Sequence, residues 1–248
     1  MSATVSAEWL ELREPADAAA RSEELAGRLA EHLGPGPHVI HDLVGGSGSM
    51  GRWLARRLAG PQHWVVHDRD ERLLELAADT SETRRSDITR LAPGDLAGAS
   101  AVTASALLDL LTREELERML GACTGLPLLL ALTVAGRVSL TPAEPLDARL
   151  GAAFDDHQRR DGRLGPDAVA AVDAVVAGEV IVRPSPWEID AAQAGLAAEW
   201  LRGWVGAACE QEPALAGEAG AYQDRRLAQA AAGGLRVTVD HADLLVLP

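Results

Sequence analysis

Two acids on either side of a glycine-rich turn are the residues of this sequence best placed to bind a nucleotide. Asp42 lies at the end of a short apolar strand, just before the turn 45–48, which reads Gly-Gly-Ser-Gly. Arg52–Leu58 has the apolar spacing of a helix, and a second strand, Trp64–Val66, leads to Asp68. This is the order of a nucleotide-binding βαβ unit, in which glycines admit the ligand and the second acid accepts ribose hydroxyl protons.

The same turn fits two classes of nucleotide. Gly46, Gly48 and Gly51 match the dinucleotide fingerprint GxGxxG, with Asp68 at the expected distance beyond them. However, a carboxylate at Asp42 would repel a pyrophosphate and would pair with the amino group of an amino-acid moiety. The chain also ends on a strand behind two long helical patterns, and not on a second mononucleotide-binding half. These features favour a nucleoside that carries an amino acid.

Residues 42–48 (Asp-Leu-Val-Gly-Gly-Ser-Gly) resemble the first motif of the class I S-adenosylmethionine-dependent methyltransferases, an acid followed by alternating glycines. Val44 stands where the family has its first glycine. The resemblance implies that Asp68 binds the ribose, Asp87 meets the adenine and the stretch 101–109 flanks the methionine part. The residues that it implies for S-adenosyl-L-methionine are Asp42, Val44, Gly45, Gly46, Ser47, Gly48, Asp68, Arg69, Asp87, Ile88 and Ser105.

The resemblance also implies an α/β fold with three layers, the Rossmann-like methyltransferase fold, whose sheet is mostly parallel with an antiparallel last strand. The alternating and then apolar run 236–247 resembles that strand. We expect a single methyltransferase-like domain over 1–248. It comprises an N-terminal helical cap (1–37), a cofactor-binding core (38–134) and, in the C-terminal half, a helical insertion (187–232).

Helical periodicity outside the core is strongest at Ala16–Leu33, Asp190–Glu210 and Pro213–Ala232. The first of these is expected as one helix that begins near Pro15. An apolar stripe in the insertion needs a surface to cover it; its members are Leu196, Trp200, Leu201, Trp204 and Val205. We therefore expect the insertion to form a lid over the acceptor site, with Ala16–Leu33 as its partner.

Composition narrows the class of partner. The chain has 248 residues, 47% of them hydrophobic, and a formal net charge of −14, which argues against binding a nucleic-acid backbone. It has no apolar run of membrane-span length and no basic-then-apolar leader, so we expect a cytoplasmic protein with no membrane partner. The absence of lysine excludes Schiff-base chemistry and a P-loop. Cys123 and Cys209 lack metal-ligand spacing, so no metal is expected.

We therefore predict methyl transfer from S-adenosyl-L-methionine to a small-molecule substrate; the acceptor atom and the oligomeric state are not predicted. A sulfonium is already activated, so a general base is needed only where the acceptor loses a proton. His157 and Asp109 are the candidate bases, although His157 has the alternative of a solvated helix face. Two other functions stay open: an NAD(P)-dependent oxidoreductase, for which the chain lacks a Tyr-x-x-x-Lys pair, and a non-catalytic binding protein.

Val44 gives a separate expectation. If it replaces a glycine, Val44→Gly should leave cofactor binding intact but lower stability by up to about 1 kcal/mol, because glycine gains entropy in the unfolded chain.

Overall fold

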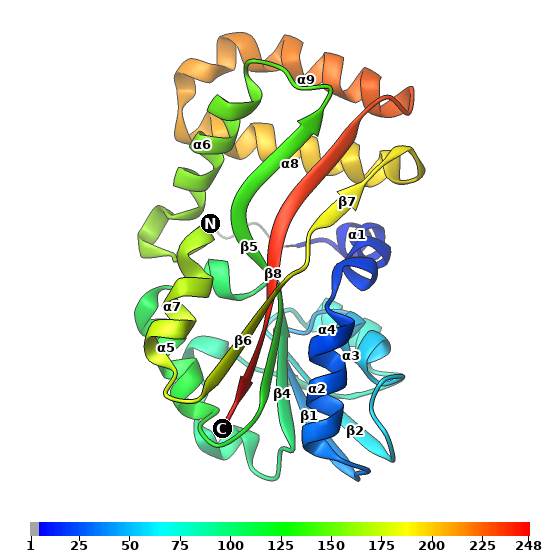
Figure 1. Cartoon of the computed structure of the whole chain (residues 1–248), viewed down its shortest axis with the longest axis vertical. Helices are drawn as coiled ribbons and strands as arrows, with labels where there is room; N and C mark the ends of the chain where they lie inside the picture. The colour runs from blue at the N-terminus through cyan, green and yellow to red at the C-terminus, as the bar shows by residue number, and fades with distance from the viewer. Residues whose placement is uncertain (1–4) are drawn as a thin grey trace.

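An eight-stranded mixed sheet forms the frame of the molecule in a computed structural model that describes residues 5–248 (Figure 1). The strand order is β3-β2-β1-β4-β5-β8-β6, and β7 also pairs with β8. Pairs from β3 to β5 are parallel, whereas β8 is antiparallel to β5, β6 and β7. The strands are β1 (His38–Leu43), β2 (Gln62–Asp68), β3 (Glu82–Arg85), β4 (Ala101–Ser105), β5 (Leu128–Thr141), β6 (Glu179–Pro184), β7 (Trp187–Ile189) and β8 (Arg236–Leu247).

Helices cover both faces of this sheet, which confirms the expected three-layer α/β fold with an antiparallel last strand. They are α1 (Ala7–Ala20), α2 (Glu23–Leu33), α3 (Ser49–Leu54), α4 (Glu71–Ala77), α5 (Arg113–Ala122), α6 (Asp147–Gln158), α7 (Ala168–Val175), α8 (Ala194–Gln211) and α9 (Ala216–Ala231). One core cluster joins α2, α3 and α8 to the sheet, and a second joins α5 and α7 to its other face. None of the helices within residues 5–248 has the length and apolar character that a membrane span requires.

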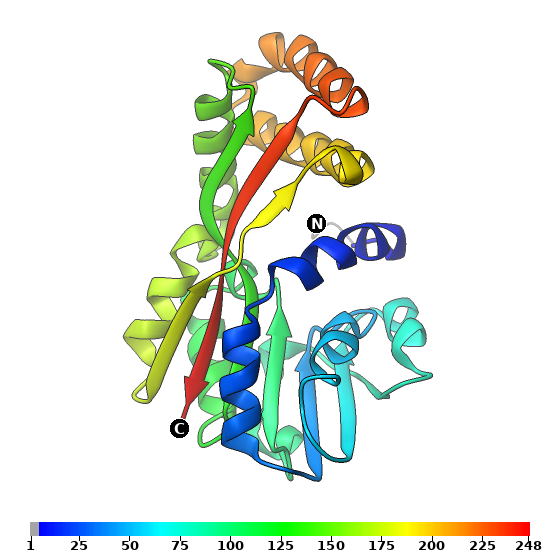
Figure 2. The same cartoon turned by 45° about the vertical axis from the view of Figure 1, so that its right-hand side comes forward.

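The molecule has a lower and an upper half, and the longest strands, β5 and β8, run through both. The first part of β5 is buried on both faces, as a central strand of a parallel sheet should be. Beyond it, half-buried and exposed residues alternate, and β5 continues upward paired only with β8. β7 pairs with the other side of β8 there, and in Figures 1 and 2 this three-stranded extension carries α6, α8 and α9 above the lower α/β half.

The N-terminal helical region differs from the single helix expected at Ala16–Leu33. It forms two helices, α1 and α2, that meet at Arg21-Ser22, and Pro15 lies inside α1 rather than at its start. The break has a local cause: the Ser22 side chain accepts a hydrogen bond from the backbone N–H of Leu25 and caps α2. A buried carboxylate of β8, Asp243, accepts the N–H of Ser22 at 2.7 Å and holds the junction on the sheet.

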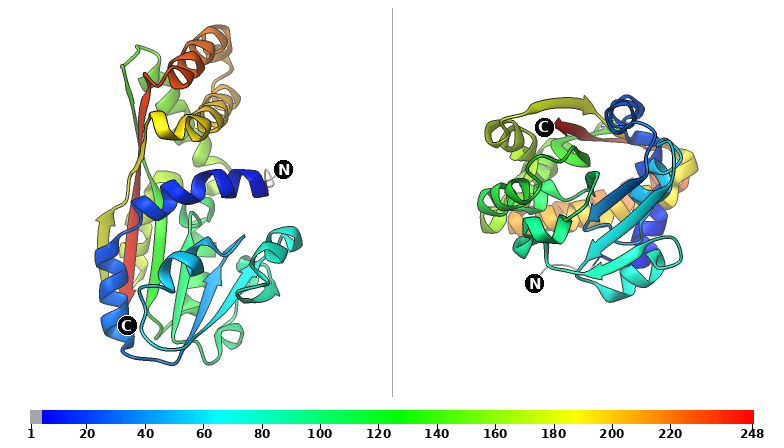
Figure 3. Two further views of the ribbon diagram at one scale, coloured as in Figure 1. Left: turned by 90° about the vertical axis from the view of Figure 1, so that its right-hand side faces the viewer. Right: turned by 90° about the horizontal axis from the view of Figure 1, so that it is seen from below.

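The insertion also differs from the expectation in one respect, because Trp187–Ile189 is a strand and not part of a helical segment. The predicted apolar stripe of α8 is buried and packs against α6 and α9, and its Trp200 and Trp204 rings stack with centroids 5.1 Å apart. Within the N-terminal pair, α1 packs against α8, whereas α2 packs mainly on β8 and β5. In Figure 3, α1 crosses between the upper helices and the lower strands. Whether the insertion acts as a lid over an acceptor stays a prediction.

A buried pair of histidines joins β1 to β2 in the lower half. His41 Nδ1 and His67 Nε2 lie 3.0 Å apart, and His67 Nδ1 lies 3.2 Å from Ser86 Oγ. Burial lowers the pKa of His67 to about 4, to which the neighbouring His41 and Arg84 also contribute. Burial lowers the pKa of His41 as well. Both rings are therefore neutral in the folded protein at pH 7.

This pair predicts that the protein loses stability in mild acid. Between pH 6.5 and about 4 the unfolded chain binds protons at these positions while the folded chain does not, so the free energy of unfolding falls as pH falls. A complete shift of this size corresponds to roughly 3.4 kcal/mol, and the part between pH 6.5 and pH 5 to about 2 kcal/mol. Urea denaturation at pH 7.5 and pH 5 measures the difference. His67→Gln keeps a hydrogen-bonding group that does not titrate, so its pH dependence should be visibly smaller; an equal dependence would show that other groups cause it.

Candidate functional site

Two residues with unfavourable backbone angles follow the carboxyl ends of β1 and β4, and a third lies within β5, just past its last pairing with β4. Val44 follows β1 with φ = 53°, Ala106 follows β4 with φ = 51°, and Leu132 has φ = 56° where the pairing of β5 with β8 shifts register. Side chains with a Cβ rarely adopt positive φ, and such strain concentrates at functional sites. The edge between β1 and β4 is also where the strand order reverses, the usual ligand position in open α/β sheets. Strain and topology therefore mark the same place.

A small cavity of about 50 Å³ opens at this edge beneath α1. Its walls come from α1, the glycine turn, the start of α3 and the end of β4; the lining residues are Leu10, Arg13, Asp17, Asp42, Val44, Gly45, Gly46, Ser47, Ser49, Met50, Ser105 and Ala106. Six of these are predicted cofactor-binding residues. Pockets for drug-sized ligands usually measure about 300–1,000 Å³, so a nucleoside would enter only after α1 moves away.

Asp42 is fully buried at the end of β1 and has one oxygen without a partner. Its Oδ1 accepts a hydrogen bond from Thr103 Oγ1 at 2.7 Å, whereas Oδ2 has none within the described residues. Burial raises the pKa of this carboxyl to about 7, despite the Thr103 hydrogen bond and the positive charge of Arg21. The neighbouring Gly45 needs to be glycine, because a Cβ there would lie 2.5 Å from Oδ2. The free oxygen at the cavity wall is an acceptor for a cationic group.

Arg21 is a residue of this site that the sequence analysis missed. It lies at the junction of α1 and α2, and its side chain points to the same strand ends, with 3% of its surface exposed. Nη2 donates to Ser49 Oγ and to Ser105 Oγ, each at 3.2 Å, while Nε and Nη1 have no partner among the described residues. Helical periodicity across this region conceals the break between the two helices. The signal that could have located Arg21 is the adjacent Ser22, a typical helix N-cap residue.

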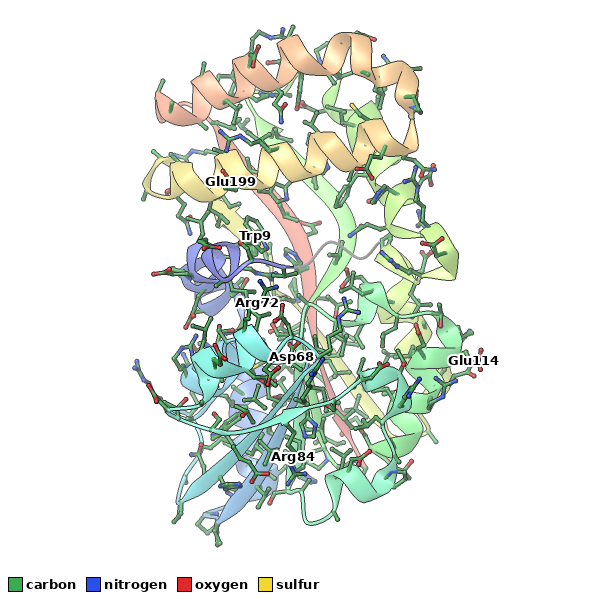
Figure 4. The ribbon with its side chains drawn as sticks, turned by 180° about the vertical axis from the view of Figure 1, so that it is seen from behind. Trp9, Asp68, Arg72, Arg84, Glu114 and Glu199 are labelled. Atoms are coloured by element: carbon green, nitrogen blue, oxygen red, sulfur yellow. The ribbon has the colours of Figure 1, made fainter. Side chains whose placement is uncertain are left out.

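Asp68 lies at the end of β2, where the sequence places it, and its carboxylate binds backbone groups. Oδ2 accepts the N–H of Gly46 at 3.1 Å, and Oδ1 accepts the N–H of Asp70 at 2.9 Å. The carboxylate therefore holds the glycine turn, and each oxygen retains a lone pair for another donor. In Figure 4, Asp68 lies at the end of the lower half nearest to α1, which carries Trp9. Asp68 does not line the small cavity, and Arg69 beside it is exposed.

The predicted adenine-binding pair lies further along the same edge, outside the cavity. Asp87 is exposed and caps a 3₁₀ turn, because its Oδ1 accepts both the N–H and the hydroxyl of Thr89, at 3.0 and 2.8 Å. These hydrogen bonds lower the pKa of Asp87. Ile88 is half-buried behind it. The structure thus gives Asp87 a local capping role, and its contact with adenine stays a prediction.

The two candidate bases lie in different surroundings. Asp109 lies in the 3₁₀ helix η3 (Leu108–Leu110), just after β4; it is buried, and its Oδ1 has no partner within the described residues. Burial raises its pKa to about 6. His157 lies on α6, with Nε2 3.2 Å from Glu210 Oε2 of α8. Neither residue lines the cavity, and the contact with Glu210 joins His157 to α8.

α1 covers the cavity and is attached through its C-terminal half. Glu14 pairs with Arg52 of α3, which also donates to the carbonyl of Ser47 in the glycine turn. Deeper in the molecule, Asp17 accepts hydrogen bonds from Nε and Nη2 of Arg13 and one from Trp187 Nε1 of β7 at 3.0 Å. The strand that sequence analysis missed thus supplies the anchor of this helix.

Comparisons with known proteins bear on the fold. No protein-family model and no curated protein sequence matches the chain. A candidate type II methyltransferase from Anaeromyxobacter dehalogenans has a similar structure, with a TM-score of 0.56 and 15% identity over 91% of this chain and 95% of its own. A SAM-dependent methyltransferase from Thiobacillus denitrificans, solved with S-adenosyl-L-homocysteine, has a TM-score of 0.48 and 13% identity over 98% of this chain and 99% of its own.

The chain therefore has the Rossmann-like fold of the class I methyltransferases. The strand order, with β8 inserted antiparallel between β5 and β6, confirms at the level of the fold the resemblance drawn from residues 42–48. At such low identity the likeness identifies no acceptor and no site residue.

The positive φ of Val44 changes the expectation for its replacement by glycine. A left-handed conformation costs an L-residue about 1–2 kcal/mol, which glycine avoids, so Val44→Gly relieves strain that offsets its gain of unfolded-state entropy. Val44→Ala is the matched control, because alanine removes the same methyl groups and keeps the strain. We expect the glycine variant to be more stable than the alanine variant by about 1 kcal/mol in urea denaturation, opposite to the usual order. An alanine variant of equal or greater stability would contradict the strained geometry.

Proposed function

We propose that the protein is an S-adenosylmethionine-dependent methyltransferase that acts on a small-molecule acceptor. The observation that carries the proposal is the joint position of Asp42, the glycine turn and Asp68 at the carboxyl ends of β1 and β2, next to the edge where the strand order reverses. A dinucleotide would place its pyrophosphate against the turn, and Asp42 beneath it opposes that placement. The amino group of S-adenosylmethionine instead suits the free Oδ2 of this carboxyl.

The residues present fit this cofactor, whose sulfonium supplies an activated methyl group. Asp68 would bind the ribose hydroxyls through its remaining lone pairs while it keeps the turn in place through Gly46. Gly45 leaves room for the Asp42 carboxyl to pack against the turn, so the turn and the Asp42 carboxyl lie side by side. The protein's own work is then to orient donor and acceptor and to exclude water.

Asp109 is the better of the two candidate bases for an acceptor that must lose a proton. Its unpaired Oδ1 lies just beyond β4, at the sheet edge where the methyl group would be presented. With a pKa of about 6, it is mainly ionised at neutral pH and is still basic enough to take a proton. His157 is engaged with Glu210 on the upper helices. Asp109 therefore takes the role of base in this proposal.

The Asp68 assignment predicts a loss of affinity on substitution. Asp68→Asn should weaken binding of S-adenosyl-L-homocysteine by about 10- to 100-fold, the scale of a lost hydrogen bond to a charged group. Asp70→Asn is the matched control, because Asp70 caps α4 and asparagine also caps helices. Calorimetry with S-adenosyl-L-homocysteine and with NAD measures both variants and the wild type. Tight binding of NAD by the wild type would favour the oxidoreductase alternative, and unchanged affinity in Asp68→Asn would refute the ribose contact.

The small cavity predicts that α1 moves during binding and becomes ordered afterwards. Amide hydrogen exchange in residues 7–20 should slow on addition of saturating S-adenosyl-L-homocysteine, because α1 supplies Leu10, Arg13 and Asp17 to the cavity wall. α2 packs on the sheet and should change less. α9, which lines no part of the cavity, provides an internal control in the same experiment. Unchanged exchange throughout α1 with ligand bound would show that this helix is scaffold and not a cover.

A further inference from the structure

Among the residues that the structure describes, Arg21 is a buried cation without a carboxylate partner. The carboxylates whose negative charges stabilise the Arg21 cation are Asp17, Asp42 and Asp243. Within residues 5–248 none of them forms an ion pair with it, because each has other donors: Arg13 and Trp187 for Asp17, Thr103 for Asp42, and two backbone N–H groups for Asp243. Removing a guanidinium from water without pairing it is costly, so this position calls for an anion that the chain itself does not supply.

Two serines connect Arg21 to the cavity. Ser49 and Ser105 line the cavity wall, and each hydroxyl oxygen accepts a hydrogen bond from Nη2 of Arg21. A hydroxyl that accepts from an arginine keeps its own proton free to donate. An anion in the cavity would therefore meet two hydroxyl donors backed by a positive charge, with Nε and Nη1 of the guanidinium also unused.

The cavity wall also carries a group that attracts a cation. The unpaired Oδ2 of Asp42 faces the same space, so one wall attracts a cation and the other an anion. A phosphate would satisfy only the second wall and would be repelled by the first when Asp42 is ionised. The ligand fragment that satisfies both walls is the zwitterionic head of an α-amino acid.

We propose that Arg21, Ser49 and Ser105 form the receptor for the carboxylate of a bound amino-acid head, whose ammonium group faces Asp42. The inference rests on the proposed function, which supplies the amino-acid part as the methionine portion of the cofactor, and it assigns that portion a second contact point. Arg21 stands at the junction of α1 and α2, so binding of the carboxylate also holds α1 over the site. The receptor thereby links occupancy of the cavity to closure of its cover.

A comparison of ligands with and without the carboxylate tests the receptor. The probes are S-adenosyl-L-homocysteine, its decarboxylated analogue, which keeps the amino group, and 5′-methylthioadenosine, which lacks the amino-acid head. Calorimetry should show that the wild type loses about 10- to 100-fold in affinity when the carboxylate is removed. Arg21→Met should bind S-adenosyl-L-homocysteine as weakly as the wild type binds the decarboxylated analogue. It should bind the decarboxylated analogue and 5′-methylthioadenosine, which both lack the carboxylate, about as well as the wild type does.

Controls separate the receptor from a structural role. Arg28→Met alters an exposed arginine of α2 and should leave all three affinities unchanged. The wild-type comparison needs no variant, and Ser105→Ala provides a second, milder test if Arg21→Met does not fold. Equal affinity of the wild type for the carboxylated and decarboxylated probes overturns the inference, as does an equal loss for every probe in Arg21→Met. If the wild type binds 5′-methylthioadenosine, but binds S-adenosyl-L-homocysteine no more tightly than the decarboxylated analogue, the inference alone fails. If it binds none of the three nucleosides, the proposed function fails and the inference falls with it.

Discussion

The burial of Asp42 without a full set of partners is the constraint on which the rest of the site depends. A carboxyl in this position is costly, and the fold keeps it there with a single hydrogen bond from Thr103 and a glycine that leaves room for its second oxygen. The cost extends to the backbone, since Val44 and Ala106 adopt positive φ on either side of the carboxyl. A fold that needed only stability would have no reason to combine these features at one edge.

Closure of this edge depends on structure that is remote in sequence. The extension of β5 and β8 above the parallel sheet brings β7 over the site, and Trp187 of that strand holds α1 through Asp17. In Figure 2, α1 accordingly lies between the two halves of the molecule. α1 thus contacts α3 in the lower half through Glu14 and β7 in the upper half through Asp17, so a ligand that moves α1 would affect contacts with both halves.

The sequence predicted the parallel part of the fold well, because its signals are local. The strands from His38 to Asp68 follow from short apolar runs, and the antiparallel last strand follows from its alternation. The helix between the first two strands was expected at Arg52–Leu58 but is α3, Ser49–Leu54, because it begins directly after the glycine turn. The break between α1 and α2 has a local signal in Ser22, a typical helix N-cap residue, but continuous helical periodicity conceals it; the contact of Ser22 with Asp243, far along the chain, was not predictable. The strand β7 has three residues, too few for a periodic signal. Arg21 was missed for the same reason as the break at which it lies.

The candidate site was predictable to a similar degree. Spacing along the chain located Asp42, the glycine turn and Asp68, and the structure brings them to one edge. Asp87 and His157 lie where the sequence places them, yet each has a local partner that explains its position without a ligand. Burial, which no spacing reveals, distinguishes Asp109 and Arg21 from the many exposed charges of the chain.

Proton release on ligand binding tests the central claim most directly. Asp42 has a pKa of about 7 in the free protein and is therefore mostly protonated at pH 6.5, and an ammonium group against Oδ2 would lower that pKa. Calorimetric titration with S-adenosyl-L-homocysteine at pH 6.5, in buffers of different ionisation enthalpy, should show release of more than half a proton from the wild type and almost none from Asp42→Asn. Binding without proton release would contradict the contact at Asp42, and absence of binding would contradict the assignment of the site.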